Sequence, residues 1–168
     1  ESETTEVLDD ILARSGPLSE SEYPVRPVGL RNPDHWFLPQ TCDSLRGLHR
    51  AVFSLSAGPV RRLFEVAFLG TVRRVSRATT QQGRLFLDAN SASEDARPTF
   101  ERVARRAIKA VCQLPEEGQV TTSLHDSRLP ILIDEPAKLC ILHPPYFNAY
   151  KYSRINSLEL AWMGVPAK

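Results

Sequence analysis

A short apolar run, Leu139 to Leu142, leads directly into the tetrapeptide His143-Pro144-Pro145-Tyr146. A run of this length and composition is typical of a buried central strand. Proline has no amide hydrogen to give to a β-ladder and fixes its own φ, so pairing must stop there and the chain becomes stiff. In open α/β sheets, ligands bind at the carboxyl ends of the strands. The sequence therefore predicts a rigid loop, carrying a tyrosine, at the ligand-binding edge of a sheet.

The chain before this loop is mainly helical in its pattern. Apolar side chains recur at helical spacing in four segments, and we expect helices over residues 5–15, 41–56, 60–78 and 93–113. A proline-rich connection, residues 17–39, joins the first two helices. Within it, Trp36 and Phe37 are expected to anchor the connection in the core.

After residue 115 the pattern becomes extended. Residues 119–126 and 137–142 predict two strands, and residues 152–163 predict a helix that follows them. The shorter run at residues 83–88 predicts a further strand or extended segment. The expected fold class is α/β: a helical region, residues 1–115, followed by an incomplete β-β-α segment, residues 116–168. Two strands do not make a stable sheet alone, so the rest of the sheet must come from elsewhere.

Charge is distributed unevenly along the chain, although the formal net charge is only +1. Residues 1–22 hold seven acidic residues and one arginine, whereas residues 58–77 and 97–109 each have a net charge of +4. Basic helices can face a polyanion such as nucleic acid, or they can simply be solvated faces. Among these arginines, Arg73, Arg74, Arg105 and Arg106 are candidates for phosphate contacts.

Cysteine content and hydropathy indicate where in the cell the protein is expected. The three cysteines are widely spaced, do not have metal-ligand spacing, and are expected to be reduced core thiols. No apolar run is long enough to span a membrane, and no signal peptide is evident. We therefore expect a cytoplasmic protein that does not bind membranes. The chain does not begin with Met and ends in GVPAK, so we also expect a fragment of a longer protein.

The tetrapeptide and its surroundings resemble the S-adenosylmethionine-dependent amino-methyltransferases of DNA. That family carries Asp, Asn or Ser followed by Pro-Pro-Tyr or Pro-Pro-Phe, and KLCILHPPYFNAYKYSRINSLELAWMG is similar to it from the strand through the following helix. Upstream, HDSRLP, HWFLPQTCDSLRGLHRAV and GTVRRVSRA also resemble the family. The match is close over residues 119–164 and loose over most of the rest. The resemblance implies that the β-β-α segment belongs to a Rossmann-like methyltransferase sheet.

The resemblance also implies roles for individual residues. His143, Pro144, Pro145 and Tyr146 would form the catalytic loop, in which Tyr146 stacks on a flipped base while the Pro144 carbonyl and the side chain at position 143 accept hydrogen bonds from its amine. The family mostly has a carboxylate, amide or hydroxyl where this chain has His143, and only a neutral imidazole can accept a hydrogen bond. The alternative for His143 is a structural histidine in a decayed site.

Residues on either side of the loop complete the expected site. Asp126 would lie near the adenine of S-adenosylmethionine, or alternatively would cap the turn after its strand together with Ser127. Asn148, Lys151 and Arg154 lie where a DNA strand could pass. We identify no metal site.

The glycine-rich turn that holds the cofactor in this family is missing. None of the eight glycines forms a G-x-G cluster, and the acidic residue that should end the second strand and bind ribose is also absent. The chain therefore resembles the catalytic-motif half of a restriction–modification or phage-defence methyltransferase, which needs a second chain or missing segment to bind S-adenosylmethionine. The alternative is a non-catalytic DNA-binding or assembly module that retains the scaffold, in which the arginine helices matter and the HPPY loop does not.

Overall fold

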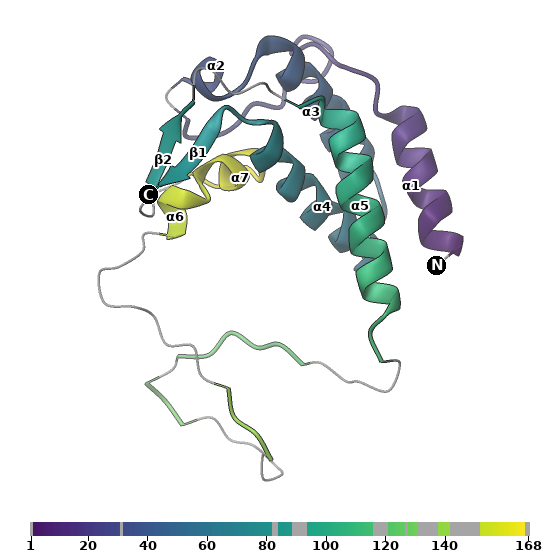
Figure 1. Cartoon of the computed structure of the whole chain (residues 1–168), viewed down its shortest axis with the longest axis vertical. Helices are drawn as coiled ribbons and strands as arrows, with labels where there is room; N and C mark the ends of the chain where they lie inside the picture. The colour runs from purple at the N-terminus through teal and green to yellow at the C-terminus, as the bar shows by residue number, and fades with distance from the viewer. Residues whose placement is uncertain are drawn as a thin grey trace.

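Helices dominate the structure, a computed structural model that describes residues 2–30, 32–81, 84–88, 94–115, 121–126, 128–130, 138–141 and 152–166. Four long helices form the body (Figure 1): α1 (Ser2–Arg14), α3 (Pro39–Phe53), α4 (Pro59–Val75) and α5 (Ala96–Cys112). Around them lie five short elements: α2 (Pro33–Trp36), β1 (Ala78–Gln81), β2 (Arg84–Leu87), α6 (Tyr152–Ile155) and α7 (Ser157–Trp162). No described helix has the length and apolar character needed to cross a membrane.

The four long helices predicted from apolar spacing are confirmed. Helices α3 and α4 begin with Pro39 and Pro59, because the first helical position needs no amide hydrogen and suits the fixed φ of proline. Helix α5 begins after Asp95, whose side chain accepts a hydrogen bond from the Arg97 backbone N–H at 3.2 Å. Helix α4 ends at Val75, earlier than predicted, because residues 78–81 form β1.

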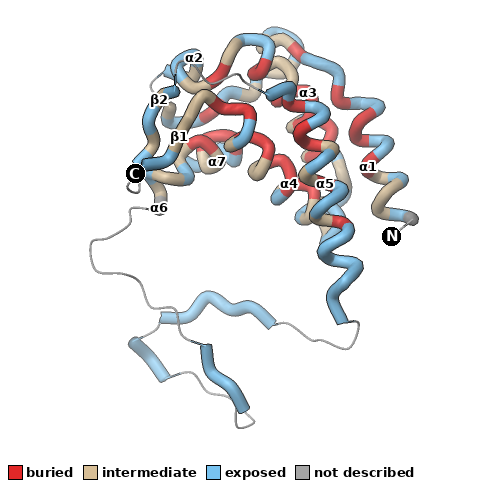
Figure 2. The backbone as a smooth tube through the Cα atoms, viewed as in Figure 1, coloured by how far each residue is buried: buried red, intermediate tan, exposed pale blue. Residues whose placement is uncertain are grey.

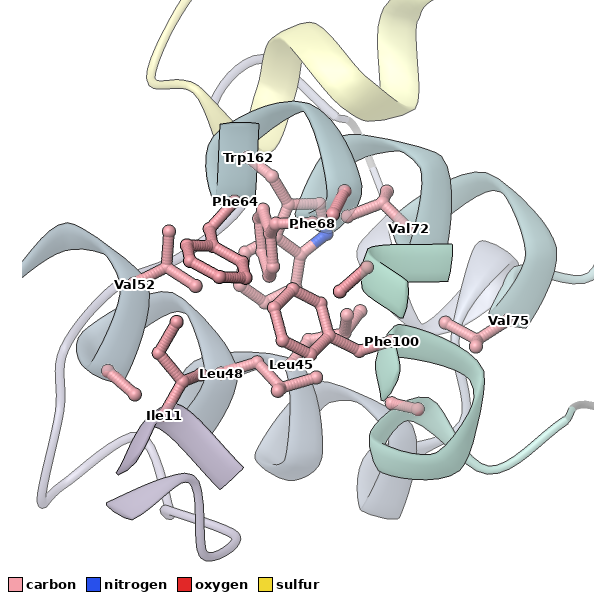
Figure 3. Close-up of a cluster of buried hydrophobic side chains, with 14 of the residues drawn as sticks. Ile11, Leu45, Leu48, Val52, Phe64, Phe68, Val72, Val75, Phe100 and Trp162 are labelled. Atoms are coloured by element: carbon pink, nitrogen blue, oxygen red, sulfur yellow. The ribbon is translucent and has the colours of Figure 1, made fainter. Parts of the chain in front are cut away.

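Aromatic side chains fill the centre of the core. Phe64 and Phe68 from α4, Phe100 from α5 and Trp162 from α7 are fully or almost fully buried and converge on one another (Figure 3). Phe37, in the connection before α3, is also fully buried, and its ring meets Trp162 edge-to-face with 6.1 Å between centroids. Burial of each such side chain stabilises the fold by roughly 1.5–3 kcal/mol. The predicted anchoring role is confirmed for Phe37, while Trp36 is only half-buried.

The sheet within the described residues is a two-stranded antiparallel hairpin. Strand β1 pairs with β2 so that Ala78 faces Leu87 and Gln81 faces Arg84. The extended segment predicted at residues 83–88 is confirmed as β2. Its partner β1 was not predicted, because ATTQ is too short to show an apolar alternation.

The two strands predicted after residue 115 are not present in the described residues of these segments. Residues 121–126 and 138–141, the described parts of these segments, form no strand and are exposed (Figure 2). Leu124, Leu139 and Ile141 are 105%, 77% and 85% exposed. A central strand needs a neighbour on each side, and the β1–β2 hairpin does not pair with these segments. The structure is therefore α/β only in the general sense of helices with a small sheet.

The C-terminal helix predicted over residues 152–163 is present as two short helices, α6 and α7, separated at Asn156. Helix α7 packs on α4, and the Val28 backbone N–H donates to the Ala161 carbonyl at 2.9 Å. The prediction that all three cysteines are core thiols holds only for Cys42, since Cys112 and Cys140 are exposed. Both lie at or beyond the end of α5, where the packed body ends.

Candidate functional site

The whole of the predicted catalytic loop lies outside the described residues. This applies to His143, Pro144, Pro145 and Tyr146 and also to the predicted DNA contacts Asn148 and Lys151. The roles predicted for these six residues stay predictions. The structure does describe what flanks the loop: residues 138–141 on one side and helix α6, from Tyr152, on the other.

Helices α6 and α7 attach the C-terminal flank of the loop to the helical body. Leu158 and Trp162 are buried in the common core, where the Trp162 ring meets Phe68 edge-to-face at 6.0 Å between centroids. The chain therefore leaves the body at the end of α5 and is held to it again from α6 onward (Figure 1). This fixes α6, the first described element after the HPPY segment, relative to the arginine-bearing helix α4.

A bidentate ion pair strengthens this attachment. The Arg73 guanidinium on α4 donates to the Glu159 carboxylate on α7 from Nε to Oε1 at 2.8 Å and from Nη2 to Oε2 at 3.1 Å. Arg73 Nη2 also donates to the Ile155 carbonyl at the end of α6. The two side chains are only 23% and 18% exposed. Arg73 is thus engaged inside the fold, which corrects its interpretation as a phosphate contact.

Three of the eight other basic residues of α4 and α5, Arg61, Arg102 and Arg105, are paired with acids as well. Arg61 pairs with Glu65 at 2.7 Å, and Arg105 pairs with Glu101 at 2.8 Å and with Asp9 of α1 at 3.5 Å. The acidic N-terminal helix therefore lies against α5 and offsets part of its charge. The alternative in which the arginine helices bind DNA stays a prediction.

Asp126, the predicted cofactor contact, makes a local turn. Arg128 donates to its carboxylate from Nη2 at 2.6 Å and from Nε at 2.9 Å, and the Arg128 backbone N–H donates at 3.0 Å. The side-chain hydrogen bond, followed by the backbone one, lowers the pKa of Asp126. This is the turn-capping alternative, made with Arg128; Ser127 lies outside the described residues. The cofactor role stays a prediction.

Arg154, a predicted DNA contact, lies at a surface hollow that the sequence did not reveal. The hollow has a volume of about 320 Å³ and is lined by Trp36, Arg84, Leu85, Arg154 and Ser157. Helix α6 packs beside β2 there (Figure 1), which brings Arg84 and Arg154 together although they are 70 positions apart. This arrangement depends on the packing of α6 against β2, which the sequence pattern does not show.

His49 is a second feature that the sequence did not reveal. Its ring stacks on Phe53 at 4.0 Å between centroids, and its Nδ1 lies 3.0 Å from the Tyr23 hydroxyl. Burial is the main cause that lowers the pKa of His49 to about 4, against a smaller opposing effect of its hydrogen bond to the Trp162 backbone. Burial likewise raises the pKa of the Cys42 thiol to about 11. Both groups are therefore neutral and have structural roles at ordinary pH.

Within the described residues, no group of three or more His, Cys, Asp or Glu side chains is placed to hold a metal ion. Searches against protein-family models, curated proteins and solved structures found no match to this chain.

Proposed function

We propose that this chain is the catalytic-motif part of a DNA amino-methyltransferase, which transfers a methyl group from S-adenosylmethionine to the exocyclic amine of a flipped adenine or cytosine. The observation that carries the proposal is the order of sequence features between residues 138 and 164. An apolar segment, HPPY, Asn-Ala and an amphipathic helix follow one another there. The attachment of that helix to α4 through Trp162 and the Arg73–Glu159 pair adds support, because a catalytic loop needs a fixed base.

The chemistry explains why such a loop is needed. The lone pair of an exocyclic amine is delocalised into the ring, so the amine is a poor nucleophile. Hydrogen bonds from the amine to the Pro144 carbonyl and to a neutral His143 would localise that lone pair toward the methyl donor. Tyr146 would stack on the flipped base, an interaction worth roughly 1–3 kcal/mol. The two prolines reduce the conformational entropy lost when the base binds.

Exposed aliphatic side chains support the need for a second part. Leu124, Leu139 and Ile141 face solvent in the two segments predicted as strands. Burial of about 25 cal/mol per Å² of apolar surface would favour their pairing with further strands. We therefore propose that a segment or chain with the glycine-rich cofactor motif completes a Rossmann-like sheet here and binds S-adenosylmethionine.

The test measures label transfer from methyl-labelled S-adenosylmethionine to DNA, with this chain combined with the part that carries the glycine-rich motif. We expect Tyr146→Ala to lower kcat/KM roughly 5- to 150-fold, the equivalent of its stacking energy. Pro144→Ala should also lower it, whereas Val66→Ala, at an exposed apolar position of α4, should not. Equal rates for all variants would overturn the assigned roles of the loop.

A further inference from the structure

The hollow between the hairpin and α6 combines two kinds of side chain that nucleic-acid sites use. Arg84 and Arg154 are both exposed and line it together, while the half-buried Trp36 and Leu85 supply its apolar part and Ser157 adds a hydroxyl. Guanidinium groups bind phosphate through paired, charge-assisted hydrogen bonds, and aromatic rings stack on bases. The charged lining is entirely basic.

The two arginines differ from most others of the molecule in their pairing. Arg61, Arg73, Arg102 and Arg105 each have an acidic partner. Within the described part of the chain, Arg84 and Arg154 form no ion pair. A guanidinium that is not engaged with a carboxylate is available for an external anion, and two at one hollow can share a phosphodiester.

The position of the hollow relates it to the HPPY loop. Arg154 follows Tyr146 by eight positions, and eight fully extended residues span at most about 29 Å. A DNA strand whose base reaches Tyr146 would have neighbouring backbone phosphates within that range. The hollow lies on α6, the element that fixes this flank of the loop to the body.

We infer that the hollow formed by Trp36, Arg84, Leu85, Arg154 and Ser157 binds the phosphodiester backbone of the DNA strand next to the target base, with Trp36 contacting the adjoining nucleoside. This inference rests on the proposed function, which supplies DNA as the ligand. The volume of the hollow, about 320 Å³, accommodates a phosphate with part of one nucleoside. Arg84 and Arg154 bind the phosphate and thereby position the strand, without reading its sequence.

The test uses the whole chain and a fluorescein-labelled duplex oligonucleotide, with binding followed by anisotropy over a range of salt concentrations. The double variant Arg84→Gln/Arg154→Gln should bind about tenfold or more weakly at low salt. The slope of log K against log salt should fall by about 0.9, because the two arginines bind one phosphate. The control is Arg62→Gln/Lys109→Gln, which changes two exposed basic residues on α4 and α5 and should keep wild-type affinity and slope.

Tryptophan fluorescence supplies an independent reading. The chain has two tryptophans, and Trp162 is buried, so DNA in the hollow should quench the emission of Trp36 and the quenching should disappear in Trp36→Phe. Failure of the chain to bind DNA, or equal weakening in the control pair, would overturn the inference. Inorganic phosphate or a deoxynucleoside monophosphate that competes as strongly as the oligonucleotide would instead assign the hollow to a small phosphorylated ligand and also overturn it.

The two proposals fail separately. If methyl transfer occurs and the arginine double variant has normal DNA affinity, the hollow is not the strand contact while the methyltransferase proposal stands. If the double variant loses DNA affinity and salt dependence but no combination transfers methyl groups, the inference about the hollow stands and the proposed reaction falls.

Discussion

Arg73 of α4 and Glu159 of α7, which are 86 positions apart in the chain, form a bidentate ion pair. Arg73 also bonds the Ile155 carbonyl, so one guanidinium holds both C-terminal helices. Its Nη1 is buried and has no hydrogen-bond partner among the described residues. The pair is mostly shielded from water, so each charge is stabilised by the other. The attachment of α6 and α7 to α4 depends on both.

Loss of this pair should destabilise the fold measurably. Glu159→Gln leaves the Arg73 charge without its partner in a shielded site, and we expect the free energy of unfolding to fall by about 1–3 kcal/mol. Urea denaturation gives this value. Arg105→Gln, which breaks exposed pairs, should change it by no more than about 1 kcal/mol. Equal effects of the two substitutions would contradict the structural role of Arg73 and Glu159.

Gly47 allows α3 to pass very close to the end of α1. A Cβ atom at position 47 would lie 2.0 Å from the Gly16 carbonyl oxygen, and backbone cannot move aside as a flexible side chain can. We expect Gly47→Ala to lower the free energy of unfolding by about 1–3 kcal/mol or more through overpacking. Gly16→Ala is the matched control, since nothing lies within 4 Å of its Cβ position. A tolerated Gly47→Ala would show that this helix contact is misplaced.

The half-buried His49 predicts a loss of stability in mild acid. Its pKa is about 4 in the folded chain and about 6.5 when unfolded, so between these values the unfolded chain binds more protons. The stabilisation is complete above pH 6.5 and is lost as pH falls toward 4, by about 1–2 kcal/mol after allowance for partial solvent access. Denaturation at several pH values should show this slope, and His49→Gln should remove it. The exposed His35 is the control, because His35→Gln should leave the slope in place.

Thiol accessibility separates the three cysteines. Cys112 and Cys140 are exposed, while Cys42 is buried and its pKa is raised to about 11, which disfavours the reactive thiolate. Alkylation of the native chain followed by mass analysis should label Cys112 and Cys140 and spare Cys42 until the chain unfolds. Under the proposed function, the part with the cofactor motif should then protect Cys140, which precedes the HPPY loop, and leave Cys112 reactive. Unchanged labelling of Cys140 in an active complex would contradict the completed sheet.

The long helices could be predicted because their signals are local. The spacing of residues such as Leu45, Leu48 and Val52 indicates both the helix and its buried face, and Pro39 and Pro59 mark where helices begin. The strands predicted at residues 119–126 and 137–142 depend on non-local pairing instead, and their described residues form no strand. Their composition suits buried strands, but a strand forms only with hydrogen-bonding neighbours, and the described part of this chain supplies none.

The candidate site could be predicted only in part. Arg154 and Asp126 were identified from their positions relative to the HPPY loop, yet Asp126 is engaged in a local turn with Arg128. Arg84 and Trp36 were missed as neighbours of Arg154, because their proximity depends on tertiary packing of α6 against the hairpin. The same packing makes Arg73 an internal partner of Glu159, which charge clustering along the sequence cannot distinguish from a phosphate contact.

The most direct measurement of the central claim is the identity of the modified nucleoside. DNA is incubated with S-adenosylmethionine and with this chain together with the part that carries the glycine-rich cofactor motif, then digested to nucleosides and analysed by mass spectrometry. The account predicts N6-methyladenine or N4-methylcytosine that disappears in Tyr146→Ala. Methylation at a ring carbon, or no methylation although the two parts form a complex that binds S-adenosylmethionine and DNA, would contradict it.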